Sequence, residues 1–400
     1  MKPTFHDILK AQSMQCAQII KTPIVHSKTF SKLIGSDIYL KQEFLQKTGS
    51  FKIRGAYFKI KSLTQYERKN GVVAASAGNH AQGVAFASSL ENIPCTIVMP
   101  KTASPAKVAA TRSYGANVIL SGINYDEAFI KATEIKSKTN AKIIHAFDDP
   151  HVIAGQGVIG LEIIDALSDI DEIYVPIGGG GLAAGILISI KTNHPNIKII
   201  GVQSKSYPSM KYSMECGKIK SVIGNRTIAD GISVSRPGKL TFNLIKKLID
   251  DIVLVDDSQI IKTMFLLMER TKMIVEPAGV VGLAHLLDAK PKNKKIVPVL
   301  CGGNIDMYLL GQIVSKGLSQ MGRLIKLFVL LPDKPGTLQT LVNEIASLSI
   351  NIVEVLHDRL STNIDAGSAG VILSLETENK NRADKLLERL KMKNIRFMLM

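Results

Sequence analysis

The sequence predicts an α/β protein with parallel sheets, followed by a small module in which two helices accompany four strands. Short apolar strands alternate with helices from residue 71 to residue 300, as in parallel sheets that helices cover on both faces. Glycine-rich segments follow two of these strands, at the sheet edge where ligands bind. Near Gly322 the order changes to strand, helix, strand, strand, helix, strand, which is the ferredoxin-like motif.

The elements of the first part follow from apolar runs separated by glycine, proline and polar residues. In order, the sequence predicts strand 71–76, helix 80–91, strand 95–100, helix 105–115, strand 117–122, helix 125–139, strand 141–146, helix 152–167, strand 172–177, helix 182–192, strand 198–204, strand 251–256, a helix after it, and strand 295–300. Because parallel strands need crossover connections, these helices are expected to cover the sheets.

The second part is a shorter series of alternating elements. It comprises strand 323–331, helix 337–348, strand 351–360, strand 369–377, helix 381–392 and strand 395–400. A boundary near residues 319–325 follows, with one region in 1–320 and a separate module in 325–400.

Composition excludes several classes of protein. With 400 residues, 46% of them hydrophobic and 21% charged, the chain is expected to form two or three globular domains. No apolar stretch reaches the roughly 18 residues of a membrane span, and the N-terminus lacks a secretory layout. The four cysteines form no C-x-x-C pair, so reduced thiols in the cytoplasm are expected. The net charge of +16 is spread along a chain without tryptophan, so neither a nucleic-acid partner nor a membrane partner is expected.

A lysine stands between two apolar residues in the segment 49–56. Lys52 lies between Phe51 and Ile53, although lysine prefers a solvated position. A buried or half-buried lysine has a depressed pKa and can attack an aldehyde. A surface lysine on an edge strand is the equally weighted alternative.

Two turns between a strand and a helix are candidate anion sites. Residues 75–80 provide free backbone N–H groups, and Asn79 is a candidate N-cap, although this segment taken alone favours an ordinary capped turn between a strand and a helix. Residues 178–181 are four glycines that allow a backbone nest for a phosphate monoester. No Gly-Lys-Ser/Thr follows them, which excludes a nucleoside-triphosphate loop. Residues 155–160 match G-x-G-x-x-G but fall inside a predicted helix, so close helix packing is expected there instead of a nicotinamide cofactor.

Four motifs occur in the order found in threonine dehydratases, also called threonine ammonia-lyases. They are Ser-Phe-Lys-Ile-Arg-Gly-Ala at 50–56, Ser-Ala-Gly-Asn-His-Ala-Gln-Gly at 76–83, the glycines 178–181 with Leu182, and Cys-Gly-Gly-Asn at 301–304. Segments 227–231 and 276–279 also resemble this family. The chain resembles these tryptophan-synthase-β-like (fold type II) pyridoxal-phosphate enzymes over essentially its whole length. The resemblance implies a catalytic region in 1–320, with a small subdomain at about residues 50–145 inserted in a larger one.

The same resemblance implies the cofactor and the roles of the site residues. The cofactor would be pyridoxal 5′-phosphate, with Lys52 as its covalent attachment point and as the catalytic base, beside Phe51. Asn79 would contact the phenolic oxygen of the ring, and Cys301 would face the pyridine nitrogen. The phosphate would be held by Gly178, Gly179, Gly180, Gly181 and Leu182. The substrate carboxylate would be held by Ser76, Ala77, Gly78, Asn79 and His80.

The implied reaction eliminates water from L-threonine and yields 2-oxobutanoate and ammonia, with L-serine to pyruvate as a side activity. Serine racemisation and β-replacement are alternatives that keep the cofactor, and a non-catalytic amino-acid sensor is a third, more distant one. Racemases of the family carry a serine where this chain has Ala77, which argues against racemisation. Gln203 occupies what resembles the metal-carboxylate position of the racemases, so no metal is expected.

The C-terminal module resembles an ACT domain. Its segment 331–338, Leu-Pro-Asp-Lys-Pro-Gly-Thr-Leu, matches the first loop of that family, and Asn351 opens the second strand. Such domains pair edge to edge and often bind a small amino acid at the interface, so Asp333, Pro335, Gly336 and Asn351 are candidate regulatory residues. Isoleucine or valine would then be an allosteric inhibitor, and a purely structural dimerisation domain is the alternative. The resemblance also implies a homo-oligomer, a dimer or a tetramer, that serves isoleucine biosynthesis or threonine breakdown.

Overall fold

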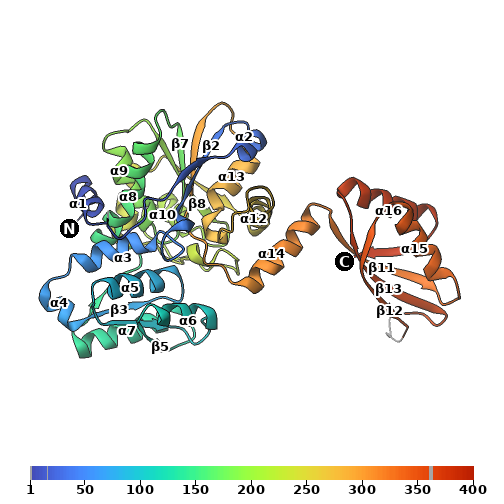
Figure 1. Ribbon diagram of the computed structural model, residues 1–400, viewed down its shortest axis with the longest axis horizontal. Helices are drawn as coiled ribbons and strands as arrows, with labels where there is room; N and C mark the ends of the chain where they lie inside the picture. Colours follow the sequence, from blue (N-terminus) through green and yellow to red (C-terminus); the bar gives the residue numbers. More distant parts are fainter. Residues whose placement is uncertain (1, 16, 360–363) are drawn as a thin grey trace. The chain divides into compact units, whose positions relative to one another are not determined.

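The computed structural model describes residues 2–15, 17–359 and 364–400, and the chain divides into two compact units, Met1–Asp306 and Met307–Met400 (Figure 1). Among the described residues, the first unit contains two sheets and the second contains one. The division falls before helix α14 (Met307–Gln320), a segment that the sequence analysis assigned to the first part. Within the described ranges, no helix is long and apolar enough to cross a membrane.

The larger sheet of the first unit has the strand order β1-β2-β10-β7-β8-β9. Its strands are β1 (Ile24–His26), β2 (Asp37–Gln42), β7 (Glu172–Pro176), β8 (Lys198–Ser204), β9 (Asp251–Val255) and β10 (Lys295–Leu300). β1 and β2 pair in antiparallel fashion, and the other neighbours pair in parallel. The glycine segments that follow β7 and β10 therefore lie at the same edge of this sheet.

The smaller sheet is wholly parallel, has the order β5-β4-β3-β6, and lies between β2 and β7 in the sequence. Its strands are β3 (Val72–Ala75), β4 (Cys95–Met99), β5 (Asn117–Leu120) and β6 (Lys142–Ile143). The predicted strand 141–146 is too long, because only two of its residues pair with β3. The chain then leaves the sheet, and His145 and Phe147 line a cavity instead.

Helices surround both sheets. They are α1 (Phe5–Gln15), α2 (Lys28–Ile34), α3 (Lys52–Lys61), α4 (Gln65–Asn70), α5 (Asn79–Leu90), α6 (Pro105–Ser113), α7 (Tyr125–Thr139), α8 (Pro150–Ala166), α9 (Gly181–Lys191), α10 (Ser209–Glu215), α11 (Lys239–Leu248), α12 (Asp257–Thr271) and α13 (Val281–Ala289), with short 3-10 turns η1 (Glu43–Leu45), η2 (Asp230–Ile232) and η3 (Pro277–Gly279). The segment before residue 71 thus contributes β1, β2 and α1 to α4, none of which the sequence analysis specified.

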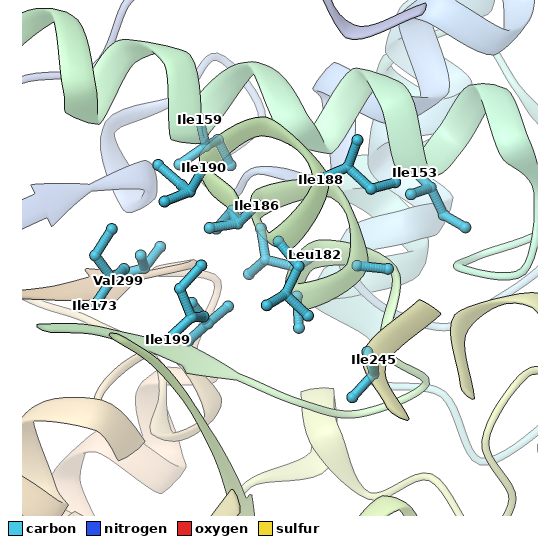
Figure 2. Close-up of a cluster of buried hydrophobic side chains, with 14 of the residues drawn as sticks. Ile153, Ile159, Ile173, Leu182, Ile186, Ile188, Ile190, Ile199, Ile245 and Val299 are labelled. Atoms are coloured by element: carbon cyan, nitrogen blue, oxygen red, sulfur yellow. The ribbon is translucent and has the colours of Figure 1, made fainter. Parts of the chain in front are cut away.

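The main core lies between α9 and the larger sheet (Figure 2). Apolar side chains of the helix and of the strands form it together: Leu182, Ile186 and Ile190 from α9, Ile173 from β7, Ile199 from β8 and Val299 from β10. α9 is buried around nearly its whole circumference, because α8 covers its other side.

Glycines allow α8 to approach both α3 and α9 closely. A Cβ atom on Gly155 would lie 2.6 Å from the carbonyl oxygen of Arg54, and one on Gly157 would lie 2.9 Å from that of Gly185. The G-x-G-x-x-G match lies inside α8, so the prediction that these glycines serve helix packing is confirmed.

The second unit contains the predicted series of four strands and two helices after α14. These are β11 (Leu324–Pro332), α15 (Thr337–Ser347), β12 (Asn351–Asp358), β13 (Ser368–Glu376), α16 (Lys380–Met392) and β14 (Arg396–Leu399). The antiparallel sheet has the order β12-β13-β11-β14, as in ferredoxin-like folds. The predicted end of its second strand at Leu360 lies outside the described residues.

Candidate active site

A cavity of about 870 Å³ lies in the first unit, at the ends of the parallel strands. Its wall contains every residue that the sequence analysis proposed for catalysis, cofactor binding and carboxylate binding: Phe51, Lys52, Ser76, Ala77, Gly78, Asn79, His80, Gly178, Gly179, Gly180, Gly181, Leu182 and Cys301. Segments that are far apart in the sequence therefore meet in one place. This volume is in the range of small-molecule sites.

Lys52 is the first residue of α3, directly after Phe51. Its half-buried side chain lines the cavity, and Nζ donates a hydrogen bond to the carbonyl oxygen of Ala146 at 3.2 Å. Burial lowers the pKa of this amine to about 8, although Cys301 and Glu276 oppose the shift. The edge-strand alternative is therefore wrong, and the position suits a nucleophilic amine.

The four glycines connect β7 to α9 in a way that larger residues could not. Gly180 is the N-cap of α9 and has φ = 97°, a left-handed conformation that glycine adopts without strain. A Cβ atom on Gly179 would collide with the ring of Phe147, and one on Gly181 would lie 3.0 Å from its Cα. A backbone nest at a helix N-terminus binds phosphate groups, so this loop fits the phosphate of pyridoxal phosphate.

Thr241, on α11, fixes the orientation of this loop. Its buried hydroxyl donates a hydrogen bond to the carbonyl oxygen of Gly179 at 2.7 Å. Because a peptide unit is planar and trans, this bond turns the N–H of Gly180 to the opposite side. The carboxylate of Asp148 accepts hydrogen bonds from the backbone N–H groups of Lys239, Leu240 and Thr241, which fixes the start of α11.

The turn after β3 differs from the prediction in one detail. Gly78 is the N-cap of α5 and provides no side-chain cap, so the interpretation of Asn79 as the capping residue is wrong. The side-chain amide of Asn79 donates its hydrogen bonds to the carboxylate of Glu276 instead. His80 Nε2 lies 2.9 Å from the carbonyl oxygen of Ile144, and burial lowers the pKa of this imidazole to about 3, so the ring is neutral. The backbone at the start of α5 remains available for a carboxylate.

Glu276 is a site residue that was not predicted from the sequence. It follows α12, is 5% exposed, and accepts hydrogen bonds from Asn79 Nδ2 on both oxygens, at 2.8 and 2.9 Å. Burial raises the pKa of this carboxyl to about 7. An acidic residue between Val275 and Pro277, in an otherwise apolar run, was the available indication. Phe147 and Thr241 were missed too, and nothing in the local sequence distinguishes them.

Cys301 follows β10 and is 3% exposed. Its thiol lies 3.7 Å from the carbonyl oxygen of Ala278, and burial raises its pKa well above the ordinary value. The thiol is therefore neutral, and a neutral thiol beside a pyridine nitrogen would not compel its protonation.

Gln203 lies at the end of β8, outside the wall of the cavity. Its amide oxygen accepts a hydrogen bond from Lys211 N at 2.9 Å, and its nitrogen donates to the carbonyl of Tyr207 at 3.3 Å. Among the described residues, no cluster of three or more His, Cys, Asp or Glu could hold a metal ion.

The four candidate regulatory residues are not assembled within one copy of the second unit. Asp333, Pro335 and Gly336 lie in the turn after β11, and Asn351 starts β12. The register pairs Asn351 with Glu376, which in turn pairs with Leu324 at the start of β11. Asn351 therefore lies at the opposite end of the sheet from the turn.

Comparison with known proteins identifies the family of the chain. Residues 16–302 match the family described as pyridoxal-phosphate dependent enzyme. The L-threonine ammonia-lyase of Thermotoga maritima is 46% identical over 384 residues, which cover 96% of each chain. A catabolic L-threonine dehydratase of Escherichia coli is 46% identical over 313 residues, which cover 77% of this chain and 95% of the relative.

Solved structures also resemble most of the chain. Threonine deaminase isoform 2 of Solanum lycopersicum has a TM-score of 0.74 and 37% identity, and covers 78% of this chain and 89% of its own. Maize serine racemase has a TM-score of 0.75 and 34% identity, and covers 80% of this chain and 99% of its own. The cofactor is pyridoxal phosphate, and the near full-length likeness to ammonia-lyases makes the protein a lyase. The chain thus belongs to the family of pyridoxal-phosphate dependent enzymes.

Proposed function

We propose that the protein is a threonine ammonia-lyase, which converts L-threonine to 2-oxobutanoate and ammonia and accepts L-serine as a minor substrate. The observation that supports this proposal most strongly is that a half-buried Lys52 with a lowered pKa lines the same cavity as the glycine loop. Relatives that are 45–46% identical over more than nine tenths of the chain, and that are named L-threonine ammonia-lyases, support this substrate.

The residues of the cavity have separate roles in this reaction. Bound pyridoxal phosphate supplies an electron-withdrawing ring that stabilises negative charge at the substrate α-carbon. The glycine loop holds the phosphate, and the backbone at the start of α5 holds the substrate carboxylate. Lys52, whose pKa of about 8 leaves part of it neutral near pH 7, accepts the α-proton at Nζ. Cys301, whose thiol stays uncharged, would face the ring nitrogen without compelling its protonation.

The test is to measure ketoacid and ammonia released from L-threonine and from L-serine by the reconstituted protein. We expect both products in equal amounts, with L-threonine the better substrate. A protein that binds the cofactor but releases neither product from either amino acid would contradict the assignment.

The likeness to maize serine racemase favours racemisation as a second candidate. Ala77 lines the cavity with a methyl group that cannot carry a proton to the opposite face of the cofactor. We therefore expect D-serine formation to be slow relative to ammonia release, which chiral chromatography measures. Sulfide with O-acetylserine is the matching test for β-replacement, and we expect no cysteine.

We propose that the second unit is an ACT domain that regulates this activity by binding a small amino acid. The ferredoxin-like order and the turn at 333–336 support this assignment. An effector that touches both this turn and Asn351 needs a second copy, because the two lie at opposite ends of one sheet. A dimer or tetramer is expected from light scattering, and isoleucine or valine should lower the rate of the full chain.

A further inference from the structure

Glu276 is a buried carboxylate in the cavity wall that takes no part in the proton transfer proposed for Lys52. It lies between α12 and η3, and a Cβ atom on Gly302 would lie 2.5 Å from its Oε1. A buried charge is costly unless it is paired or well hydrogen-bonded. Because this carboxylate is buried at such a cost and is closely packed, we expect it to have a function.

A chain of hydrogen bonds defines the orientation of two amides beside this carboxylate. Asn304 Nδ2 donates to the carbonyl oxygen of Thr48 and to Asn79 Oδ1, both at 2.7 Å. Asn79 Nδ2 donates to both oxygens of Glu276. A carbonyl oxygen and an ionised carboxylate only accept, so neither amide can turn over without placing two donors or two acceptors face to face.

We propose that Glu276 is a positioning residue for the cofactor: it holds the Asn79 amide nitrogen so that one of its N–H groups stays directed at the phenolic oxygen of the ring. The nearly equal distances place one N–H between the two carboxylate oxygens and leave the second N–H for a ligand. This inference rests on the proposed function, which puts the ring beside Asn79.

Several charged or titratable groups face Glu276, and they set the pH range in which it works. They are Asp230 of η2, Lys107 of α6, Lys52 of α3 and Cys301 after β10. Burial raises the pKa of the carboxyl to about 7, and Asp230 adds to this, whereas the hydrogen bond from Asn79 and the charge of Lys107 lower it. Protonation of the Glu276 carboxylate turns one acceptor oxygen into a donor. The hydrogen bonding from Asn79 Nδ2 to Glu276 therefore weakens as pH falls below about 7.

The test is a double-mutant cycle on the full chain, with the dissociation constant of pyridoxal phosphate and the absorption maximum of the bound cofactor as readouts. Glu276→Gln keeps the shape but replaces one acceptor oxygen with a donor, which opposes the donors around it. We expect the dissociation constant to rise about tenfold, which corresponds to the loss of roughly one hydrogen bond. We also expect the absorption maximum of the bound cofactor to shift. In an Asn79→Ala background the same substitution should change the constant less than about twofold.

Effects of equal size in both backgrounds would overturn the proposal, because a merely structural carboxylate would act independently of Asn79. Exposed Glu215 provides the matched control, and Glu215→Gln should leave both readouts unchanged. If Glu276→Gln does not fold, Glu276→Asp enters the same cycle and should show a smaller rise that Asn79→Ala also abolishes. No substrate is present in these titrations, so failure of the inference is distinct from failure to release ketoacid from L-threonine.

Discussion

Removal of the Thr241 hydroxyl tests how the protein shapes its phosphate loop. Thr241→Val keeps the size of a fully buried side chain but removes the donor that reaches the carbonyl oxygen of Gly179 at 2.7 Å. The same hydroxyl lies 3.2 Å from the carbonyl of Gly238, so two contacts are lost together. Without this bond, the peptide between Gly179 and Gly180 can rotate, and the N–H of Gly180 is no longer held toward the phosphate.

The expected magnitude follows from leaving a buried carbonyl without this donor, which costs about 1–3 kcal/mol. If about half of that cost, roughly 1 kcal/mol, falls on the complex with the cofactor, the dissociation constant of pyridoxal phosphate rises about fivefold. Titration of the cofactor absorption against the apoprotein measures this constant, and thermal unfolding of the apoprotein measures the remainder.

Thr263→Val is the matched control, because Thr263 is equally buried and its hydroxyl bonds to the carbonyl of Gln259 within α12, far from the glycine loop in the sequence. It should leave cofactor affinity unchanged. A Thr241→Val protein whose affinity stays within about twofold of the parent would refute the proposed role of this hydroxyl.

Three further predictions follow from the same structure. Burial depresses the pKa of Lys52 to about 8, and the neutral amine is the reactive form, so the rate of cofactor capture by the apoprotein should rise with pH to a plateau, with a midpoint near 8. A midpoint near 10.4, the ordinary value for lysine, would contradict this in stopped-flow absorbance. Arg54→Met should destabilise the fold by about 3–5 kcal/mol in denaturant unfolding, because it leaves the two buried carboxylates of Glu43 and Glu162 with Lys41 as their one remaining positive partner among the described residues; a loss below about 1 kcal/mol would argue against it. Cys301→Asp should promote protonation of the ring nitrogen and raise transamination relative to ammonia release, and an unchanged ratio of the two products would exclude the thiol as a determinant.

The sequence identified the parts of the site whose chemistry is visible locally. Lys52 stood out because it lies between apolar neighbours, and Gly178 to Gly181 because four glycines are costly unless the backbone needs them. The alternation of strands and helices predicted the parallel sheets, and the change of order near Gly322 predicted the ferredoxin-like unit.

The remaining features depend on contacts between distant segments. β2 was not predicted because Lys41 interrupts its apolar pattern, yet this lysine is fully buried and its partner Glu162 lies on α8. Asn79 was interpreted as a helix cap because its true partner, Glu276, lies 197 positions away. A local pattern carries no information about such pairs, since they form only when the sheets are assembled.

The most direct test of the central claim is the formation of 2-oxobutanoate from L-threonine by the reconstituted protein and by its Lys52→Ala variant. We expect steady ketoacid release from the parent, and none above background from the variant, whose cavity retains the glycine loop but lacks the amine. Ketoacid release that survives in the variant would show that Lys52 is not the reacting group, and no release from a parent protein with bound cofactor would show that the reaction itself is wrongly assigned.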